Sequence, residues 1–208
     1  MEINIDVPSD VAFTPSVKAL QTRKGSRSTY ARMEATGGWE THISPELKAF
    51  IETQTSVFLA TANAEGQPYI QHRGGPPGFL RVLDDRTIAF ADFAGNRQYI
   101  TAGNLAENNK AHLFLIDYRN RQRVKVWCTA EVIENDAALM VQLTPADCRA
   151  RVERVIRLVV VALDANCPQH IPQKIDAVDV ERALATRDRR IAELESQLAK
   201  YIGSDSSL

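Results

Sequence analysis

Short β-rich segments follow one another through the middle of the chain, and this pattern restricts the possible folds more than any other feature. The segments are joined by short polar turns such as Asn63-Ala64-Glu65-Gly66 and Asp84-Asp85. Two such runs separated by a turn of this length predict a β-hairpin. The predicted hairpins pair residues 56–62 with 67–73, 79–83 with 86–91, and 111–118 with 123–133.

A further strand is predicted from Arg154 to Leu163, where β-branched residues are so frequent that a buried strand is favoured over a helix. About seven antiparallel strands with helices only at the margins predict a small, closed or nearly closed β-barrel, because closure removes exposed strand edges. The expected fold class is therefore mainly β, with a minority of α-helix.

Helices are predicted around this barrel. Ser44-Pro45-Glu46 combines an N-cap, a proline at the first helical position and an early acid, which predicts a helix from about Ser44 to Thr53. The polar stretch before it is interpreted as an arm, with a possible helix from Pro15 to Lys24. Asn96 predicts the N-cap of a helix that runs to about Ala106, and another helical segment is expected from Asp136.

The last part of the chain is typical of an amphipathic helix. Leu184, Ile191 and Leu198 are spaced by seven, as are Arg187, Leu194 and Tyr201, with charged residues between them. Two interpretations stay open: the helix packs on its own barrel, or it forms a self-associating seam. The expected organisation is an N-terminal arm (1–42), a barrel domain (43–172) and a C-terminal helix with a polar tail (173–208).

Composition and charge exclude several classes of protein. The 208 residues are 44% hydrophobic and 25% charged, enough for one complete core. The 25 Lys and Arg against 26 Asp and Glu give no electrostatic footprint for nucleic acid or an acidic membrane. Three widely spaced cysteines form no secreted disulfide framework, and neither a signal peptide nor a membrane span is recognisable. We expect a soluble, cytoplasmic protein with a small-molecule partner.

Polar blocks at two consecutive strand ends carry the strongest functional signal. In the second block, Arg97 and Gln98 would stand just after the expected N-cap Asn96. Free backbone amides and the helix dipole favour an anion at such a position. Arg97 is therefore the first candidate for a phosphate ligand, and the alternative is a surface arginine held by a carboxylate such as Asp92.

The first block, Gln71-His72-Arg73, runs into a loop that begins with Gly74 and Gly75. Glycines allow a flat ring to lie close to the backbone. The three polar side chains would meet the carbonyl and imide edges of a planar heterocycle, and Arg73 would stabilise negative charge on a reduced ring. The alternative is a plain proline-glycine loop between strands.

Together these blocks resemble the pyridoxamine 5'-phosphate oxidase-like flavoproteins, which bind flavin mononucleotide (FMN) on a split β-barrel. The resemblance covers residues 43–171 and includes residues 56–62, 71–75, 92–98 and Asn104-Leu105. A late Asn-Cys-Pro-Gln-His segment, residues 166–170, is similar to a bacterial branch of these proteins. The resemblance implies a homodimer with the site at the subunit interface, where Arg97 and Gln98 hold the phosphate and Gln169 approaches the flavin of the partner subunit.

The same resemblance implies a full set of FMN ligands: Gln71, His72, Arg73, Gly74, Asp92, Phe93, Asn96, Arg97, Gln98, Asn104 and Gln169. His72 or His170 would shuttle a proton in an FMN-dependent oxidoreductase. The basic strand motif and arginine-rich C-terminal segment of the vitamin-converting enzymes are not recognisable, so the small-molecule substrate is not assigned. Two other readings stay open: a flavin-binding carrier, sensor or stress-linked protein without turnover, and a haem- or deazaflavin-binding relative.

Other residues give weaker signals. Cys167 and His170 look like half a metal site, but no second ligand pair is present, so no metal is predicted. Cys167 is better read as a loop cysteine than as a nucleophile. Trp127 and Phe114 are expected in the core, and His112 is expected to be a satisfied core or edge histidine without a catalytic role.

Overall fold

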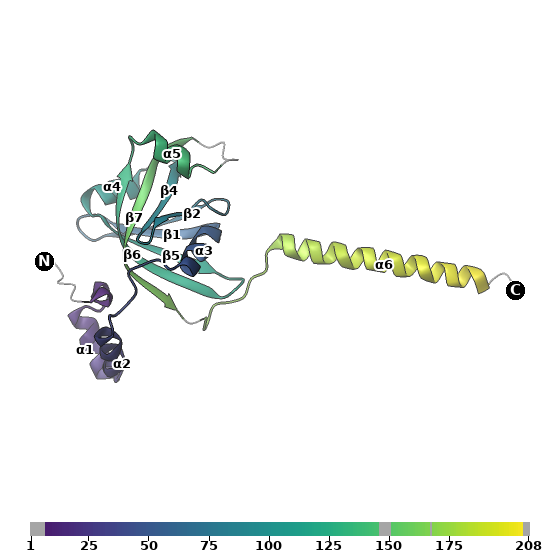
Figure 1. Ribbon diagram of the computed structural model, residues 1–208, viewed down its shortest axis with the longest axis horizontal. Helices are drawn as coiled ribbons and strands as arrows, with labels where there is room; N and C mark the ends of the chain where they lie inside the picture. Colours follow the sequence, from purple (N-terminus) through teal and green to yellow (C-terminus); the bar gives the residue numbers. More distant parts are fainter. Residues whose placement is uncertain (1–6, 146–150, 167, 206–208) are drawn as a thin grey trace. The chain divides into compact units, whose positions relative to one another are not determined.

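The computed structural model describes residues 7–145, 151–166 and 168–205. The chain divides into two compact units, one comprising residues 1–117 and 122–168, the other residues 118–121 and 169–208. Each unit is described by itself, and Figure 1 labels most of their helices and strands.

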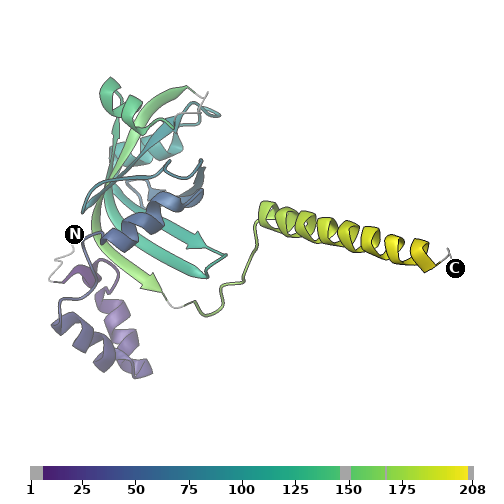
Figure 2. The same ribbon diagram turned by 45° about the vertical axis from the view of Figure 1, so that its right-hand side comes forward.

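The first unit is built on one sheet of seven antiparallel strands in the order β2-β1-β5-β6-β7-β4-β3. Their bounds are β1 Ser56–Ala62, β2 Pro68–Gly74, β3 Arg81–Asp84, β4 Thr87–Phe93, β5 Lys110–Asp117, β6 Gln122–Ile133 and β7 Val152–Asn166. The strands curve around a common interior (Figure 2), and among the described strands the two edges, β2 and β3, are not paired with each other. The predicted antiparallel split barrel with three hairpins is confirmed, and the barrel is open rather than closed.

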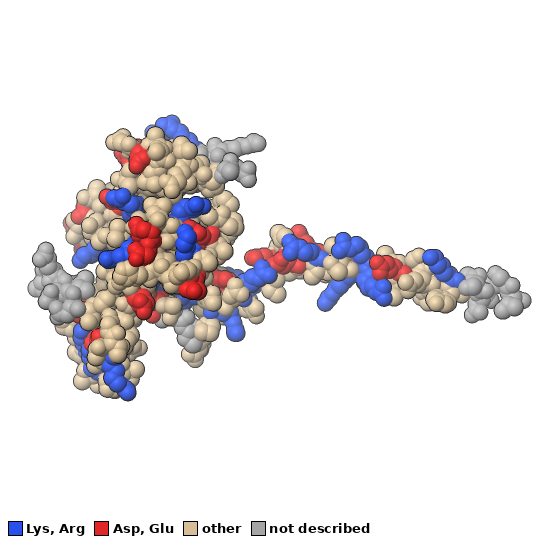
Figure 3. Space-filling model, in the orientation of Figure 1, with Lys and Arg blue, Asp and Glu red and all other residues tan. Residues whose placement is uncertain are grey.

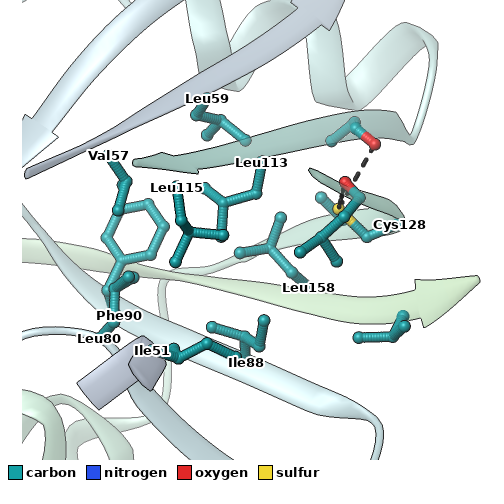
Figure 4. Packing of buried hydrophobic residues seen from close by; sticks show 14 of the residues in the cluster. Ile51, Val57, Leu59, Leu80, Ile88, Phe90, Leu113, Leu115, Cys128 and Leu158 are labelled. Atoms are coloured by element: carbon teal, nitrogen blue, oxygen red, sulfur yellow. Dashed lines mark hydrogen bonds between the residues drawn. The ribbon is translucent and has the colours of Figure 1, made fainter. Parts of the chain in front are cut away.

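Residues that alternate along the strands fill the interior (Figure 4). The labelled side chains come from β1, β4, β5, β6, β7 and the segments 45–53 and 75–80, and they meet in one cluster: Ile51, Val57, Leu59, Leu80, Ile88, Phe90, Leu113, Leu115, Cys128 and Leu158. Cys128 on β6 donates its thiol hydrogen to the Ala111 carbonyl at 3.4 Å. Burial raises the pKa of Cys128 to about 12, so this thiol stays neutral and unreactive. Cys148 and Cys167 lie outside the described residues.

Strand alternation also corrects the expectation for the aromatic side chains. Val126 and Cys128 point into the interior, so Trp127 between them lies on the other face and is only half-buried. Phe114, between the buried Leu113 and Leu115, is half-buried for the same reason. The prediction that Trp127 and Phe114 are core residues was therefore wrong.

The N-terminal arm is folded onto that outer face. It contains a short 3₁₀ helix, η1 (Pro8–Val11), the predicted α1 (Pro15–Lys24) and α2 (Arg27–Ala35), which was not predicted. Trp39, which follows α2, stacks on Trp127 with ring centroids 4.6 Å apart, and Phe13 packs against Trp39 at 5.0 Å. His112 lies edge-on to Trp127. Burial lowers the pKa of His112, and the positive charge of Lys125 lowers it further.

Two further helices of this unit agree with the sequence. In α3 (Pro45–Thr53) the Ser44 hydroxyl accepts a hydrogen bond from the Leu47 amide at 3.2 Å, which confirms the predicted cap. In α5 (Ala137–Leu143) the Asp136 carboxylate accepts from the Leu139 amide at 2.9 Å. Leu143 of α5 is buried against β4 and β7.

The helix α4 (Ile100–Glu107) begins later than predicted. Its N-cap is Tyr99 rather than Asn96, because Arg97 and Tyr99 adopt left-handed backbone angles, with φ of 61° and 56°. Left-handed residues interrupt a right-handed helix. Asn96 instead accepts a hydrogen bond from the Gln98 amide at 3.2 Å. Arg97 and Gln98 therefore stand in the loop that precedes the helix and not in its first turn.

The second unit consists mainly of α6 (Ala177–Asp205), a helix of 29 residues. Its first turn is tied to residues 118–121: Arg119 lies 2.6 Å from a carboxylate oxygen of Asp179 and 3.7 Å from one of Asp176. Just before the helix, the Lys174 ammonium lies 3.8 Å from the centre of the Tyr118 ring. No helix in the described part of the chain is both long and apolar enough to span a bilayer.

Candidate functional site

A pocket of about 230 Å³ lies where the end of β2, the end of β4, the start of β7 and the loop before α4 meet. Strands distant in sequence contribute to it, so the fold and not a single motif creates it. Eight residues from the two polar blocks line it: Gln71, Arg73, Asp92, Phe93, Gly95, Asn96, Arg97 and Gln98. The rest of the lining consists of Tyr69, Tyr99, Ile100, Thr101, Ala102, Glu153 and Arg154.

Asp92 is the acidic centre of this pocket. It lies opposite Arg154 in the β4–β7 register, and its Oδ2 is 3.5 Å from the Arg154 Nε. Its Oδ1 is 2.7 Å from the Arg73 Nη1 on β2, a strand that is not a sheet neighbour of β4. Burial raises the pKa of the Asp92 carboxyl, although Arg73 and Arg154 act in the opposite direction.

Arg154 is held from several sides. Its Nη2 donates to Glu153 at 2.7 Å, and its Nη1 lies 3.4 Å from Glu134. Its guanidinium carbon lies 4.8 Å from the centre of the Tyr99 ring, within the range of a cation–π contact. The side chain is only 9% exposed, so Arg154 is a buried, multiply paired cation.

Arg97 differs from the other two arginines of the pocket. Its Nε donates to the Tyr99 hydroxyl at 3.2 Å, and this hydrogen bond raises the pKa of Arg97. Among the described residues none forms an ion pair with Arg97, whereas Asp92 is engaged by Arg73 and Arg154. The alternative reading, in which Asp92 holds Arg97 as a surface arginine, is therefore not what the structure shows. The terminal nitrogens of Arg97 stay available to an anionic ligand.

Charge and hydrogen bonding define what the pocket accepts. Three guanidiniums (Arg73, Arg97, Arg154) against two carboxylates (Asp92, Glu153) leave one net positive charge in the lining. Gln71 accepts a hydrogen bond from the Thr101 hydroxyl at 2.9 Å, which fixes its amide and leaves the Nε2 group for a ligand. The arrangement suits an anion that also carries hydrogen-bond acceptors.

Comparison with known proteins identifies the family. Residues 43–166, more than half of the chain, match the family model described as Pyridoxamine 5'-phosphate oxidase. The chain belongs to the pyridoxamine 5'-phosphate oxidase family. No curated protein matches the chain.

Several solved structures of low sequence identity are similar to this member of the oxidase family. HupZ of Group A Streptococcus is 22% identical, with 64% of this chain and 99% of that chain covered and a TM-score of 0.49. A putative pyridoxamine 5'-phosphate oxidase of Lactobacillus delbrueckii is 25% identical, with coverages of 60% and 95% and a TM-score of 0.46. An FMN-binding protein of Syntrophomonas wolfei is 12% identical, with coverages of 70% and 97% and a TM-score of 0.46.

His72 and Gly74 are not brought into the pocket of this oxidase-family chain. Side chains alternate along β2, so Gln71 and Arg73 face the pocket while His72 and Gly74 face the opposite side. There the His72 Nε2 lies 2.8 Å from the Ser56 hydroxyl, and its ring packs edge-on to Phe58. Treating the consecutive residues 71–74 as one cluster ignored this alternation.

Gly75 has a structural explanation that does not involve a ligand. A Cβ atom at this position would lie 2.6 Å from the Phe79 Cβ, and Phe79 is buried. Glycine is therefore needed for close packing of the loop on the core. For Gly75 the plain-loop interpretation is sufficient.

Asn104, a predicted FMN ligand, lies outside the pocket lining. It is buried in α4 and donates from its Nδ2 to the Thr61 hydroxyl of β1 at 3.0 Å. This hydrogen bond joins α4 to β1. Because both residues are buried, water cannot replace either partner of the bond.

We expect Asn104→Ala to lower the free energy of unfolding by about 2 kcal/mol, since it removes a buried hydrogen bond and leaves the Thr61 hydroxyl unpaired. Chemical denaturation measures this, with Asn109→Ala, an exposed position just after α4, as the control. A variant of Asn104 with unchanged stability that no longer takes up FMN would assign the residue to the ligand instead.

Gln169 and His170 belong to the second unit, so their roles beside a flavin stay predictions, and Cys167 lies outside the described residues. Within the described ranges no group of three or more His, Cys, Asp or Glu side chains is placed to hold a metal ion.

Sequence reasoning missed Glu153 and Arg154, the β7 contribution to the pocket. Arg154 was seen only as the start of an apolar strand. The signal that was available is chemical: an arginine at the head of a buried strand needs carboxylate partners. Pairing it with Asp92 required the β4–β7 register, which the sequence does not provide.

Proposed function

We propose that this chain is an FMN-binding flavoprotein and an FMN-dependent oxidoreductase of a small-molecule substrate. The observation that carries the proposal is the pocket with one net positive charge, at whose rim Arg97 is without a carboxylate partner among the described residues. Membership of the oxidase family makes a phosphate-bearing flavin the natural anion for this position.

The residues present fit FMN. Arg97 and Gln98 would hold the phosphate, because a guanidinium and a side-chain amide in an exposed loop are suitable donors to its oxygens. Gln71 and Arg73 would meet the polar edge of the ring system. Arg73 and Arg154 add two further guanidiniums to the lining, which favours an anionic ligand.

Bound FMN would supply the redox chemistry by accepting a hydride and passing electrons to an acceptor. The chain's own contribution is electrostatic and positional. Arg73 would stabilise negative charge next to the ring, and the Thr101 hydrogen bond to Gln71 would fix the orientation of the amide that contacts it.

We propose further that two copies of the chain complete the site. A volume of about 230 Å³ lies below the range of about 300–1,000 Å³ that is usual for small-molecule sites. A surface from a second copy would enclose the remaining part of the cofactor, and Gln169 and His170 are the residues proposed to provide it.

A second candidate function is a flavin-binding carrier or sensor without turnover. It is favoured by the position of His72, which faces away from the pocket and is not placed to transfer a proton there. Among the residues that line the pocket none is a histidine. Steady-state turnover with electron donors would distinguish an oxidoreductase from a carrier.

The test of the cofactor assignment is the visible absorption spectrum of the untagged protein, with mass analysis of the compound released on denaturation. A flavin spectrum and the mass of FMN are expected. A released haem or deazaflavin would replace the proposal with one of the other cofactor readings. A colourless protein that takes up no added FMN would contradict it.

A further inference from the structure

The helix α6 carries an apolar stripe with the spacing of a coiled coil. Written as heptads, the a positions are Ala177, Leu184, Ile191 and Leu198, and the d positions are Val180, Arg187, Leu194 and Tyr201. Each large apolar side chain of this stripe is 43% to 76% exposed. The stripe is a surface of defined geometry for a partner helix.

The stripe is long enough for a stable pair of helices. The 29 residues of α6 span about 43 Å at 1.5 Å per residue. The spacing of seven is kept over more than three heptads, which is the length at which a coiled coil becomes the favoured interpretation. Helices in proteins draw most of their stability from packing an amphipathic face, so a partner also explains why so long a helix would persist.

Charges beside the stripe identify the partner and its orientation. The e positions Glu181, Asp188 and Glu195 are all acidic, whereas Arg190 occupies a g position. An antiparallel pair places e next to e, which would bring carboxylates together. A parallel pair places g next to the e position five residues later in the other helix, which joins Arg190 to Glu195. Figure 3 shows both signs of charge along α6.

We propose that α6 forms a parallel, in-register, two-stranded coiled coil with α6 of a second copy of this chain. Ile191 at a followed by Leu194 at d is the combination that favours two strands. Arg187 is the polar residue at a d position, where its neighbour in the other helix is Asp188. A single polar core residue of this kind fixes register at a cost in stability.

The first turn of α6 is anchored to residues 118–121, whereas the described residues of the apolar stripe beyond it are not covered. Arg119 pairs with Asp179 at 2.6 Å, and the Gln173 amide donates to the Arg119 carbonyl at 3.2 Å. Beyond this turn every described residue from 180 to 201 is exposed. The competing possibility is that the stripe packs on the barrel of the same chain. Cysteine cross-linking distinguishes this possibility from the coiled coil.

Cysteine cross-linking of the full chain tests the proposal. Identical a positions face each other only in a parallel, in-register pair, so Leu184→Cys is expected to form an intermolecular disulfide with itself under mild oxidation. Ser196→Cys, at an f position on the far side of the helix, is the matched control, and the parent chain gives the background of the native cysteines. Several-fold more cross-linked dimer from Leu184→Cys than from Ser196→Cys supports the seam. Equal yields would overturn it, as expected if the helix packs on its own barrel or pairs antiparallel.

A second comparison uses adjacent positions in the Leu184→Cys background. Ile191→Asp places a charge in the seam, while Ala192→Asp places the same charge at the neighbouring b position. We expect the first change to abolish the disulfide and the second to leave it within about twofold of the parent yield. Loss in both variants, or in neither, would contradict the proposed seam.

The outcome is independent of the cofactor and of the proposed barrel homodimer. A colourless protein would end the FMN proposal without changing the cross-linking yield. Conversely, an Ile191→Asp variant that still takes up FMN but forms no α6 disulfide would separate the two modes of association.

Discussion

Replacement of Arg154 by Met is expected to lower the free energy of unfolding by about 3 kcal/mol at pH 8, because it removes one of the two guanidiniums that face the Asp92 carboxylate and the guanidinium that pairs with Glu153. Methionine keeps most of the apolar stem but removes the guanidinium that contacts Asp92, Glu153 and Glu134. Breaking a buried pair by removing one partner is costly even where the intact pair contributes little.

This loss of stability should depend on pH in a defined direction. Burial raises the folded-state pKa of Asp92, and Arg154 opposes that increase, so the variant should have a still higher pKa. A carboxyl whose folded pKa is raised destabilises the fold progressively as pH increases from the unfolded pKa through the folded value. Below the ordinary value of 3.8 the group is protonated in both states and this contribution vanishes. Urea denaturation should therefore give a smaller difference between variant and parent at pH 5 than at pH 8.

Arg157→Met is the matched control, since it makes the same change three residues further along β7. Arg157 pairs with Glu131 at the surface, where the two side chains are 43% and 50% exposed. We expect a loss within about 1 kcal/mol that changes little with pH. Similar losses from both variants would show that the network around Asp92 contributes no more than a surface ion pair.

The second large effect is expected on cofactor affinity. Arg97→Ala should weaken FMN binding about 10- to 100-fold, because it removes a charge-assisted contact to the phosphate. Arg97→Lys should recover part of the loss, since lysine keeps the charge but not the forked geometry. Quenching of flavin fluorescence during titration of the cofactor-depleted protein measures both affinities.

Arg121→Ala is a suitable control for this change. Arg121 is also an exposed arginine with a left-handed backbone, with φ of 54° against 61° for Arg97. Strain at a positive φ is thus matched between the two positions. Wild-type FMN affinity in the Arg97→Ala variant would remove Arg97 from the phosphate site, while equal losses in both variants would point to a general effect of these substitutions.

Local patterns in the sequence were enough for most of the fold. The hairpins, the caps at Ser44 and Asp136 and the β7 strand depend on residues close together in the chain, so turn chemistry and β-branching reveal them. The helix α2 was missed because it is polar and its N-cap Ser26 forms no side-chain cap hydrogen bond, so neither apolar spacing nor capping chemistry marks it. The start of α4 was misplaced because Asn96 forms its turn two residues ahead without a helix following.

The site, like the fold, was predicted where short-range patterns in the sequence mark it and missed where they do not. The two polar blocks, with Arg97, Gln71 and Arg73, were visible in the sequence because strand ends concentrate polar side chains, and these residues do line one pocket. The strand-end block placed His72 with them and the family resemblance added Asn104, whereas β2 alternation turns His72 away and helix packing buries Asn104 against Thr61.

What the sequence determined by itself is thus the type and order of the strands, the residue chemistry of the two blocks and the heptads of α6. Only the tertiary structure decided that Arg73 reaches Asp92 between strands that are not sheet neighbours, and that Arg154 joins them from β7. The reason is physical: a short-range pattern records turns and faces, but the curvature of the sheet brings β2, β4 and β7 together. Charged residues such as Arg73 and Arg154, which lie far from Asp92 in the sequence, meet it only when the sheet has curved.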